Sequence, residues 1–339
     1  MKTQVSKIEV YPWHSDHWEN FLNSRRYNRL SHAILLSGPS GLGKISFANR
    51  MSCALVCDAS DIKQQPCLQC EQCRLCDNFS HPDIFWLQPE VDEKVIRVDA
   101  IRKLINKTTL KPQKNGRRIF VINSMDQLNK SGLNALLKTL EEPTSSCIFF
   151  LISSKPHLLP LTILSRCQKY NFSYVNDSIA EPWMQNQLTN LESDIDTENL
   201  LSLSGGAPLK AIKPDNLERL RVSKELIKTF VLLKKRKINP IEALRPYAKM
   251  EIEQLLEDMM RIISDFIRLK NTENPLRLFF YSSKDELLAL CCDIDIQGLF
   301  NYLDSLCLLK KQINFNLNTE MILEKIFIDW LNLTRFVKT

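Results

Sequence analysis

The sequence predicts an α/β domain with a parallel sheet, followed by a half of the chain that is helical throughout. An apolar run at 33–37 leads into a glycine-rich loop at 38–44 and then into a segment with helical spacing, which is the order strand, loop, helix. Further apolar runs alternate with amphipathic segments, and such alternation favours a parallel sheet. After about Tyr170 the strand signals stop. We expect the other strands at 84–87, 118–122 and 147–152, with helices between them at about 98–107 and 130–140.

Helical patterns fill the chain from Asn176 onward. They are interrupted at 205–208, which reads Gly-Gly-Ala-Pro, and at Asn239-Pro240, because glycine and proline end helices. We therefore expect an α/β domain over residues 1–172, a small helical domain over 173–213 and a larger helical domain over 214–339. The helices expected in the last domain are 217–233, 241–269, 283–291, 296–312 and 319–333.

Length and composition limit the class of protein. The 339 residues, 44% of them apolar, are enough for two or three packed domains. No apolar run approaches the roughly 20 residues that span a bilayer, and residues 1–7 lack the apolar core of a signal peptide. We therefore expect a cytoplasmic protein without a membrane partner. The net charge of +6, from 45 Lys+Arg against 39 Asp+Glu, permits contact with nucleic acid without requiring it.

The loop at 38–44 has the Gly-x4-Gly-Lys pattern of a phosphate-binding loop, in the expected place between a strand and a helix. Backbone N–H groups and the helix N-terminus favour bound phosphate there. A working loop places Ser or Thr after the lysine to bind Mg²⁺, but Ile45 stands at that position. The candidate nucleotide-binding residues are therefore a degenerate set: Gly38, Gly41, Gly43 and Lys44.

The strand at 118–122 should end in an acidic pair that holds magnesium and polarises the attacking water. It ends in Asn123-Ser124, and Asp126 follows at a position that we expect to be a solvated turn. Without the hydroxyl and the acids, most of the electrostatic stabilisation of phosphoryl transfer is lost. We therefore expect no hydrolysis at this loop. ATP binding there is disfavoured, although Lys44 and the glycines leave it open.

Five of the eleven cysteines lie between Cys57 and Cys76, in a chain far longer than secreted disulfide scaffolds. The spacing Cys67-x2-Cys70-x2-Cys73 lets a tight loop turn three thiolates toward one tetrahedral zinc, and Cys57 supplies a fourth from a separate segment. The alternative tetrad ending in Cys76 resembles an iron–sulfur run, but it lacks the final x3 spacing and the following proline. We predict a zinc-binding insertion at about 57–76. The cysteines expected in the core are Cys53, Cys147, Cys291, Cys292 and Cys307.

Basic residues concentrate between Arg97 and Arg118, and Asp99 is the only acid in that stretch. Such asymmetry suits a phosphate backbone, and it is equally typical of a solvated helix face. Both interpretations stay open. The candidates for DNA contact are Arg102, Lys103 and Lys107.

Two motifs connect the first domain to a known family. Residues 134–143 read Asn-Ala-Leu-Leu-Lys-Thr-Leu-Glu-Glu-Pro, and Ser165-Arg166-Cys167 follows. Together with His32-Ala33 and His81-Pro82-Asp83, they resemble the clamp-loader ATPases of the AAA+ family across the whole first domain. The resemblance implies an AAA+ sheet domain, a small helical lid domain and an all-helical collar domain that assembles with partner subunits.

The departures from the family pattern resemble its delta-prime branch, in bacterial DNA polymerase III, rather than its motor subunits. They are the degenerate loop, the missing acidic pair, and Leu209 where an ATP-sensing arginine would stand. The resemblance implies an arginine finger at Arg166 that acts in trans at a neighbour's ATP site, where the rigid fork of a guanidinium fits phosphate oxygens. It also implies structural zinc on the tetrad that includes Cys57, with Cys76 as a spare thiol.

The partners that the resemblance implies are the motor subunits and the delta subunit of a hetero-oligomeric clamp loader, the sliding clamp and primer-template DNA. In related loaders the helix that corresponds to the one with Arg102 faces the DNA. The chain then acts as a stator that does not hydrolyse ATP, as one subunit of a polymerase holoenzyme. The alternative is an autonomous ATP-hydrolysing motor of the same fold, which hydrolysis by the isolated chain would reveal.

Overall fold

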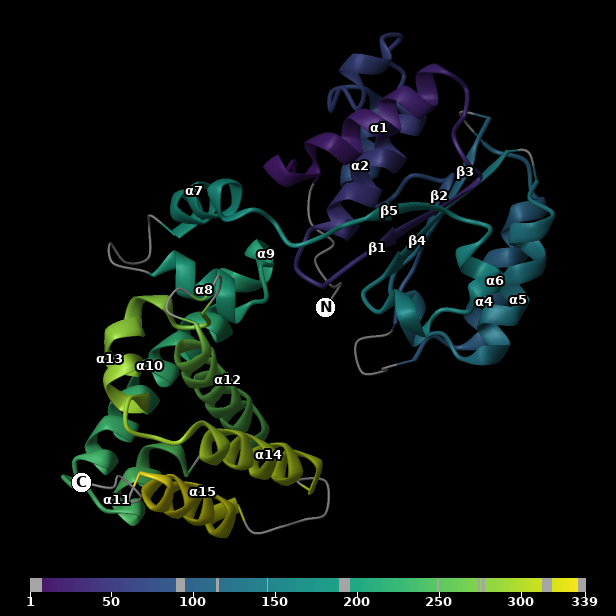
Figure 1. The fold of residues 1–339 in the computed structure, drawn as a ribbon. Helices are drawn as coiled ribbons and strands as arrows, with labels where there is room; N and C mark the ends of the chain where they lie inside the picture. Colours follow the sequence, from purple (N-terminus) through teal and green to yellow (C-terminus); the bar gives the residue numbers. More distant parts are fainter. Residues whose placement is uncertain are drawn as a thin grey trace. The chain divides into compact units, whose positions relative to one another are not determined.

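The computed structural model describes most of the chain, which divides into two units. Residues 1–7, 90–94, 114–115, 145, 189–195, 249, 273–274, 276–277, 313–318 and 335–339 are not described. Unit 1 comprises Met1–Trp183 with Ala207–Lys210, and unit 2 comprises Met184–Gly206 with Ala211–Thr339 (Figure 1). The expectation that the chain has no signal peptide rests on residues 1–7, which lie outside the described residues. The three-domain division at residues 172 and 213 stays a prediction.

Unit 1 is built on a five-stranded sheet in which all strands run parallel, in the order β2-β3-β4-β1-β5. The predicted fold class, an α/β domain with a parallel sheet followed by helices, is therefore confirmed. The three central strands are buried along their whole length, which is typical of a parallel sheet with helices on both faces. The strands are β1 (Ala33–Ser37), β2 (Ile84–Leu87), β3 (Arg118–Ile122), β4 (Cys147–Ser153) and β5 (Gln168–Asn171).

The sequence did not predict β5, at one edge of the sheet. It reads Gln-Lys-Tyr-Asn, and only Tyr170 among its residues is buried. Pairing with β1 uses the backbone, with Ile34 opposite Gln168 and Ser37 opposite Asn171. An edge strand can therefore form without the apolar run that marks a central one.

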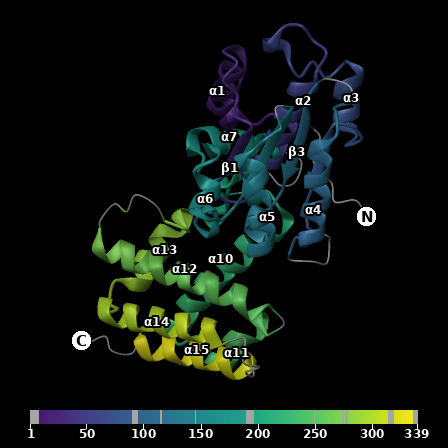
Figure 2. The same ribbon diagram turned by 90° about the vertical axis from the view of Figure 1, so that its right-hand side faces the viewer.

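One face of the sheet is covered by α4 (Val98–Asn106), α5 (Lys130–Glu141) and α6 (Leu161–Leu164) (Figures 1 and 2). The first two helices confirm the predicted ranges to within one residue at each end. Their apolar side chains, including Ile101 and Leu136, form one buried cluster with the strands. This packing fixes the end of α5 beside the segment that carries Arg166.

The opposite face of the sheet is covered by α1 (Ser15–Arg26) and α2 (Lys44–Val56) (Figure 1). Phe21 and Phe47 from these two helices are fully buried. The short helix α3 (Glu71–Asp77) packs beside α2. Helix α2 therefore joins the glycine loop at its start to the cysteine-rich segment at its end.

Three short helices follow the sheet. They are α7 (Asp177–Leu188), which runs from unit 1 into unit 2, α8 (Thr197–Leu203) and α9 (Pro208–Ala211). Most of α9 belongs to unit 1, because 207–210 packs on the glycine loop.

The rest of unit 2 is helical, as predicted, but the expected helix over 241–269 is wrong. It is two helices, α11 (Pro240–Leu244) and α12 (Ile252–Asn271). Pro246 lies between them and can neither donate an N–H nor fit the preceding helical turn. No helix in the described parts of the chain is long and apolar enough to span a bilayer. The other predicted helices are confirmed as α10 (Pro214–Lys234), α13 (Lys284–Cys291), α14 (Ile296–Gln312) and α15 (Thr319–Leu333).

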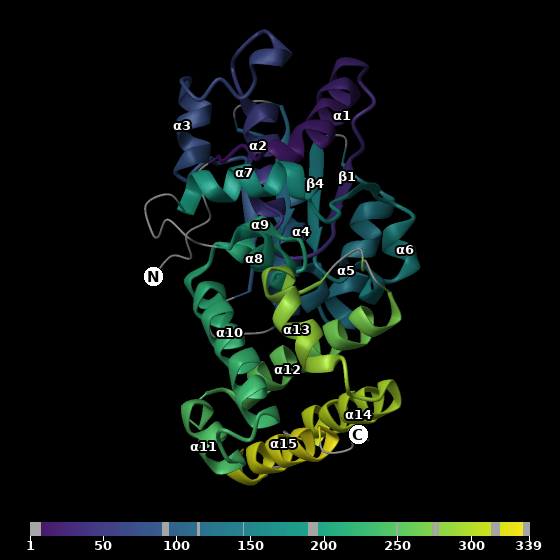
Figure 3. The same ribbon diagram turned by 60° about the vertical axis from the view of Figure 1, so that its left-hand side comes forward.

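Helix α15, which carries Trp330, packs against α11 and α14 in unit 2 (Figure 3). The side chain of Trp330 is fully buried, and its ring stacks on Phe266 with centroids 5.6 Å apart. The indole N–H donates to the carbonyl of Phe230 at 3.4 Å. A buried indole thus has both its apolar surface and its one polar group satisfied.

Candidate functional site

The glycine loop lies at the edge of the sheet where the carboxyl ends of β3, β4 and β1 meet. It follows β1, and its last residue opens α2. The N–H of Gly38 donates to the carbonyl of Ser153, at the end of β4, at 3.2 Å. Gly43, the N-cap of α2, has a φ of 79°, in the left-handed region that favours glycine. The strand, loop and helix predicted for phosphate binding are therefore in place.

Lys44 is buried against its own loop. It is 5% exposed, and its Nζ donates to the carbonyls of Gly38 at 2.6 Å and Pro39 at 2.5 Å. Burial lowers the pKa of Lys44 to about 8, while the charge on Asp126 acts in the opposite direction. Two of the three ammonium donors are therefore used within the chain.

The segment 207–210 packs tightly on Gly41. A Cβ on Gly41 would lie 2.7 Å from the Cβ of Lys210, so no side chain fits there without a shift. The carbonyl of Gly41 accepts a hydrogen bond from the N–H of Leu209 at 3.2 Å. Leu209 thus contacts the loop through its backbone.

Aromatic side chains pack on the other side of the loop. A Cβ on Gly43 would lie 2.6 Å from the ring of Tyr11. Tyr11 stacks on Trp13 with ring centroids 5.0 Å apart, and the edge of Trp183 meets Trp13 at 5.0 Å. The indole N–H of Trp13 donates to the carbonyl of Leu42 at 3.1 Å. The loop is therefore covered by the chain's own groups on two sides.

The hydroxyl of Ser46 is next to position 45, where a metal-binding Ser or Thr would stand, but it has another role. Ser46, one residue after Ile45, is buried; its Oγ donates to the carbonyl of Glu9 at 2.9 Å and accepts from the N–H of Glu9 at 3.2 Å. Ser46 thus ties the N-terminal segment to α2. It does not replace the hydroxyl that Ile45 lacks.

Asp126 lies in a turn, as expected, and it also forms a hydrogen bond that the sequence did not predict. It is half-buried, and its Oδ1 accepts a hydrogen bond from the N–H of Ser154 at 2.9 Å. The turn at Met125–Gln127 brings the carboxylate back toward the end of β4. No signal in the sequence connects residues 28 positions apart in this way.

Arg166 lies between α6 and β5, and its side chain is 33% exposed. One terminal nitrogen lies 2.6 Å from Oε1 of Glu141, the last residue of α5. The other donates to the carbonyl of Thr162 at 2.7 Å. The guanidinium is therefore accessible and held in one orientation, while Glu141 is itself 47% exposed.

The four cysteines predicted as metal ligands lie together. The Sγ atoms of Cys57, Cys67, Cys70 and Cys73 are all within 4.8 Å of one another. The Sγ atoms of Cys67 and Cys73 are 3.9 Å apart, and those of Cys57 and Cys70 are 4.0 Å apart. A tetrahedron with metal–sulfur bonds of about 2.3 Å has edges of about 3.8 Å. The cluster therefore has the donor set and the spacing of a tetrahedral metal site.

Backbone N–H groups point at the sulfur atoms of this cluster. The N–H of Cys67 approaches the Sγ of Cys57, that of Cys70 the Sγ of Cys67, and that of Cys73 the Sγ of Cys70, each at 3.4 Å. The donors from Gln69 and Cys70 lower the pKa of the Cys67 thiol to about 6. Thiolates are the form that binds metal, and N–H donors favour that form.

Cys76 lies outside the cluster. Cys76 lies on α3 and is 2% exposed. Its thiol forms a hydrogen bond with that of Cys53, and this bond together with burial raises the pKa of the Cys53 thiol far above its ordinary value. Cys53, Cys147 and Cys291 are buried as expected. The expectation of a core position is wrong for two others, since Cys292 is exposed and Cys307 is only partly buried.

The basic residues on α4 and directly after it separate into two groups. Arg102 is 70% exposed and lies 3.9 Å from Asp99 on the same helix. Lys103 and Lys107 line a pocket beside β2. Contact of these three residues with DNA stays a prediction.

Comparison with known proteins covers both units. A family model described as "DNA polymerase III, delta subunit" matches residues 13–176, and one described as "DNA polymerase III, delta subunit, C terminal" matches residues 218–332. The DNA polymerase III subunit delta' of Pseudomonas aeruginosa is 36% identical over 208 residues, 60% of this chain and 60% of that protein. That of Haemophilus influenzae is 30% identical over 261 residues, 77% of this chain and 78% of that protein.

The chain is also similar to a second kind of DNA polymerase III subunit, over a shorter stretch. The DNA polymerase III subunit tau of Bacillus subtilis is 36% identical over 153 residues, which is 45% of this chain and 26% of that protein. The delta' similarity extends further and its family models match both units. The chain therefore belongs to the delta' family of DNA polymerase III subunits.

Proposed function

We propose that this chain is a subunit of the clamp loader of DNA polymerase III, which places the sliding clamp on primed DNA. In this role it is a stator that does not hydrolyse ATP, and it supplies Arg166 as an arginine finger to the ATP site of a neighbouring motor subunit. The observation that carries the proposal is the contrast between two cations: Lys44 is buried and bonded to its own loop, whereas Arg166 is accessible.

The geometry of the glycine loop supports a silent local site. Ile45 offers no metal ligand, β3 is followed by Asn123-Ser124 in place of an acidic pair, and Ser46 is bonded to Glu9. Phosphoryl transfer needs a metal ion and positioned charges, and these positions supply neither. The cover from Tyr11 and from 207–210 further disfavours nucleotide binding.

The surroundings of Arg166 support a finger that works in trans. A guanidinium is charged at any pH that the protein meets, and its planar fork fits phosphate oxygens. Glu141 holds it within the isolated chain, but an exposed ion pair contributes at most about 1 kcal/mol. A neighbour's nucleotide phosphates therefore have only a weak competitor to displace.

The proposed partners are those of the family: motor subunits, a delta subunit, the sliding clamp and primer-template DNA. The similarity to a tau subunit over 153 residues supports a shared assembly. We further propose that Cys57, Cys67, Cys70 and Cys73 hold structural zinc, which four thiolates at these separations suit. When bound, the metal supplies crosslinks between the end of α2 and the loop at 67–73, and no chemistry of turnover.

The test is ATP turnover by a complex reconstituted with motor subunits, delta subunit, clamp and primed DNA. Arg166→Ala should lower turnover at the neighbouring site by about 10³-fold or more. Stimulation by clamp and DNA then falls to what the other motor sites supply. Lys44→Ala, an equal loss of one positive charge, should leave turnover unchanged. Gel filtration of each complex establishes that the variants assemble.

Glu141→Gln sharpens the test, because it removes the competitor and leaves the finger. At limiting ATP we expect turnover to rise by up to about fivefold, the value of one exposed ion pair. A fall would show that Glu141 orients the finger and does not compete for it.

The alternative function, an autonomous ATP-hydrolysing motor, is favoured by one observation. The loop keeps Gly38, Gly43 and Lys44, and 153 residues of the chain are similar to a tau subunit. The same experiment decides between the two functions. Loss of turnover with Lys44→Ala, together with full activity of Arg166→Ala, would establish the motor.

A further inference from the structure

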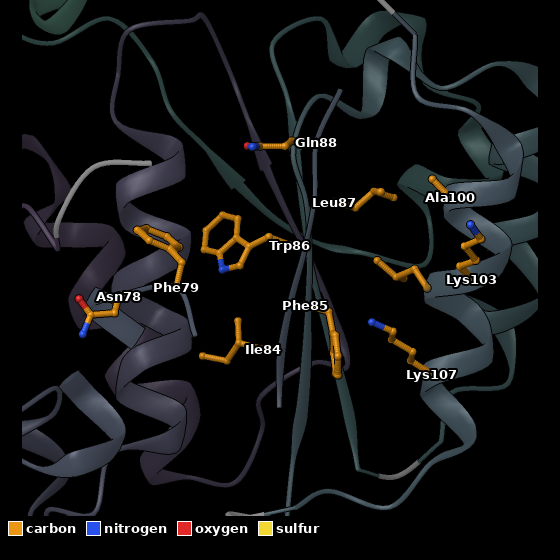
Figure 4. Close-up of a pocket in the computed structure, with 11 residues that line it drawn as sticks. Asn78, Phe79, Ile84, Phe85, Trp86, Leu87, Gln88, Ala100, Lys103 and Lys107 are labelled. Carbon is orange, nitrogen blue, oxygen red and sulfur yellow. The ribbon is translucent and has the colours of Figure 1, made fainter. Parts of the chain in front are cut away.

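A pocket beside β2 has no part in the ATPase chemistry proposed above. It has a volume of about 570 Å³ and lies along β2, between the end of α3 and α4 (Figure 4). β2 is the outer strand of the sheet, and within the described residues it pairs only with β3. The pocket is therefore open along the edge of the sheet.

The described residues on the outer side of β2 differ in their backbone bonding, because the N–H of Ile84 donates to the carbonyl of His81 at 3.2 Å whereas Trp86 has no such partner. The carbonyls of Asp83 and Leu87 accept the N–H groups of Ile119 and Asn123, at 2.9 Å and 2.8 Å, on the side of β3. Backbone groups of successive residues in a strand point to opposite sides, so those of Trp86 point away from β3. Neither the N–H nor the C=O of Trp86 has a hydrogen-bond partner within the described chain. An extended segment can pair with such an edge.

The pocket has different chemistry on the two sides of the strand. Figure 4 shows Phe79 and Trp86 on one side, and their rings meet edge to face with centroids 5.6 Å apart. On the other side it shows Phe85 facing Lys103 and Lys107, and the Nζ of Lys107 lies 4.5 Å from the centre of the Phe85 ring. One side is therefore apolar, and the other carries two positive charges.

The two lysines favour an anionic occupant. Lys103 on α4 and Lys107, which directly follows the helix, are both exposed. They are four residues apart, a separation at which like charges repel. Among the described residues, no acid forms an ion pair with either of them, and the one acid of α4, Asp99, lies near Arg102. A negative charge in the pocket would offset this repulsion.

We propose that β2 and this pocket bind an extended segment of a partner protein in which apolar and acidic residues alternate, added to the sheet as a further strand. Side chains of such a segment point alternately to opposite sides. The apolar set then meets Phe79 and Trp86, and the acidic set meets Lys103 and Lys107. The backbone of the segment bonds to the free groups of Trp86, as in other complexes in which a peptide extends a sheet.

A nucleic acid fits the same pocket less well. Its phosphates would use the two lysines but would leave the backbone of Trp86 without a partner. Phe85 offers no open ring face for a base, because Phe120 stacks on it at 5.3 Å and Lys107 lies over it at 4.5 Å. The edge of the strand is thus the feature that favours a peptide.

The probe is a fluorescein-labelled decapeptide of alternating glutamate and valine, titrated against the full-length chain and followed by fluorescence anisotropy. Three further probes are matched to it: the lysine–valine decapeptide, the glutamate–valine decapeptide with N-methyl groups along one edge, and an oligothymidine of similar length. We expect saturable binding of the first probe alone. Binding should weaken as salt is added, since the charges are exposed.

The variants compare charge reversal at the two lysines of the pocket with charge reversal at Arg102, which lies nearby on α4. Lys103→Glu with Lys107→Glu should weaken binding of the glutamate–valine peptide about tenfold or more. The double variant changes the net charge by more than a single variant does. Each single variant, Lys103→Glu or Lys107→Glu, is therefore compared with Arg102→Glu, which makes the same change of charge. Arg102 lies outside the pocket, so Arg102→Glu should change the affinity for the peptide less than about twofold. Each variant is checked by circular dichroism for its helical content.

Three results would overturn the proposal. They are absence of saturable binding at millimolar peptide, equal loss with Arg102→Glu and Lys103→Glu, and binding of the N-methylated peptide as tight as that of the unmodified one. Saturable binding of the oligothymidine with the same dependence on Lys103 and Lys107 would assign the pocket to DNA instead. The N-methyl comparison uses the wild-type chain, so it decides the matter even if a variant does not fold.

Discussion

Helix α2 carries a recognisable motif at each end, and the two ends differ in how much of their chemistry is present. At its start the glycine loop keeps Gly43 and Lys44, but Ile45 stands where a metal-binding hydroxyl belongs and Lys44 is bonded within the loop. At its end Cys57 meets three further thiols at the spacing of a tetrahedral metal site. A motif's spacing thus predicts where the chain turns, whereas its activity depends on which groups remain unbonded and accessible.

The largest expected effect comes from removing a ligand of the cysteine cluster at the end of α2. Cys70→Ser removes one of four ligands, and because metal binding is coupled to folding, we expect the free energy of unfolding to fall by about 5 kcal/mol. Zinc content by mass spectrometry of the native protein and thermal unfolding measure both consequences. The control is Cys76→Ala, which changes the buried fifth thiol on α3. Equal loss of metal in the two variants would mean that Cys76 is a ligand.

A smaller effect is expected at the start of α2, where burial of Lys44 should make the free energy of unfolding depend on pH. Lys44 titrates at its ordinary pKa of 10.5 in the unfolded chain and at about 8 in the folded one. The folded state thus binds this proton less tightly, so the contribution of Lys44 to stability is greatest above pH 10.5, falls as the pH drops toward 8, and is lowest below that. The difference is about 3 kcal/mol.

Comparison with Lys44→Met isolates this contribution from the other groups that titrate at high pH. As the pH rises from 8 to 10.5, wild type should gain stability relative to the variant, as measured by urea denaturation. Parallel curves would show that Lys44 is not buried in solution, and the contrast between the two ends of α2 would then weaken.

The smallest effect tests the cover over the loop. Gly41 and Gly116 both have positive φ, 84° and 67°, but a Cβ on Gly41 meets Lys210 whereas one on Gly116 meets nothing within 4 Å. Both alanine variants carry the backbone strain, so the difference between them reports the packing of 207–210. We expect Gly41→Ala to be less stable than Gly116→Ala by about 2 kcal/mol. Equal loss of stability would mean that the segment does not rest on the loop.

The sequence predicted the central strands and most helices because their apolar periodicity is local. It missed β5, whose pairing depends on the backbone of β1 and not on its own side chains. The single helix expected over 241–269 overlooked Pro246, which the apolar pattern outweighed. Local sequence features therefore explain the correctly predicted strands and helices, and they also explain why the helix over 241–269 is interrupted. The formation of β5 is explained only by its long-range pairing with β1.

The candidate sites divide in the same way. The cysteine tetrad could be predicted, because x2 spacing alone constrains three of its ligands. The contacts of Arg166 with Glu141 and of Tyr11 with Gly43 could not, since each joins residues far apart in the sequence through the packing of whole elements. Sequence motifs named the residues, and the fold decided which of them face solvent.

The position of Trp330 makes the two units optically separable. Of the five tryptophans, it is the one in unit 2, where its buried ring stacks on Phe266. Replacing the other four, all in unit 1, would leave a chain whose ultraviolet emission reports on the helical unit alone. Stopped-flow experiments with that chain and its complement, which lacks only Trp330, would then record when each unit loses its structure.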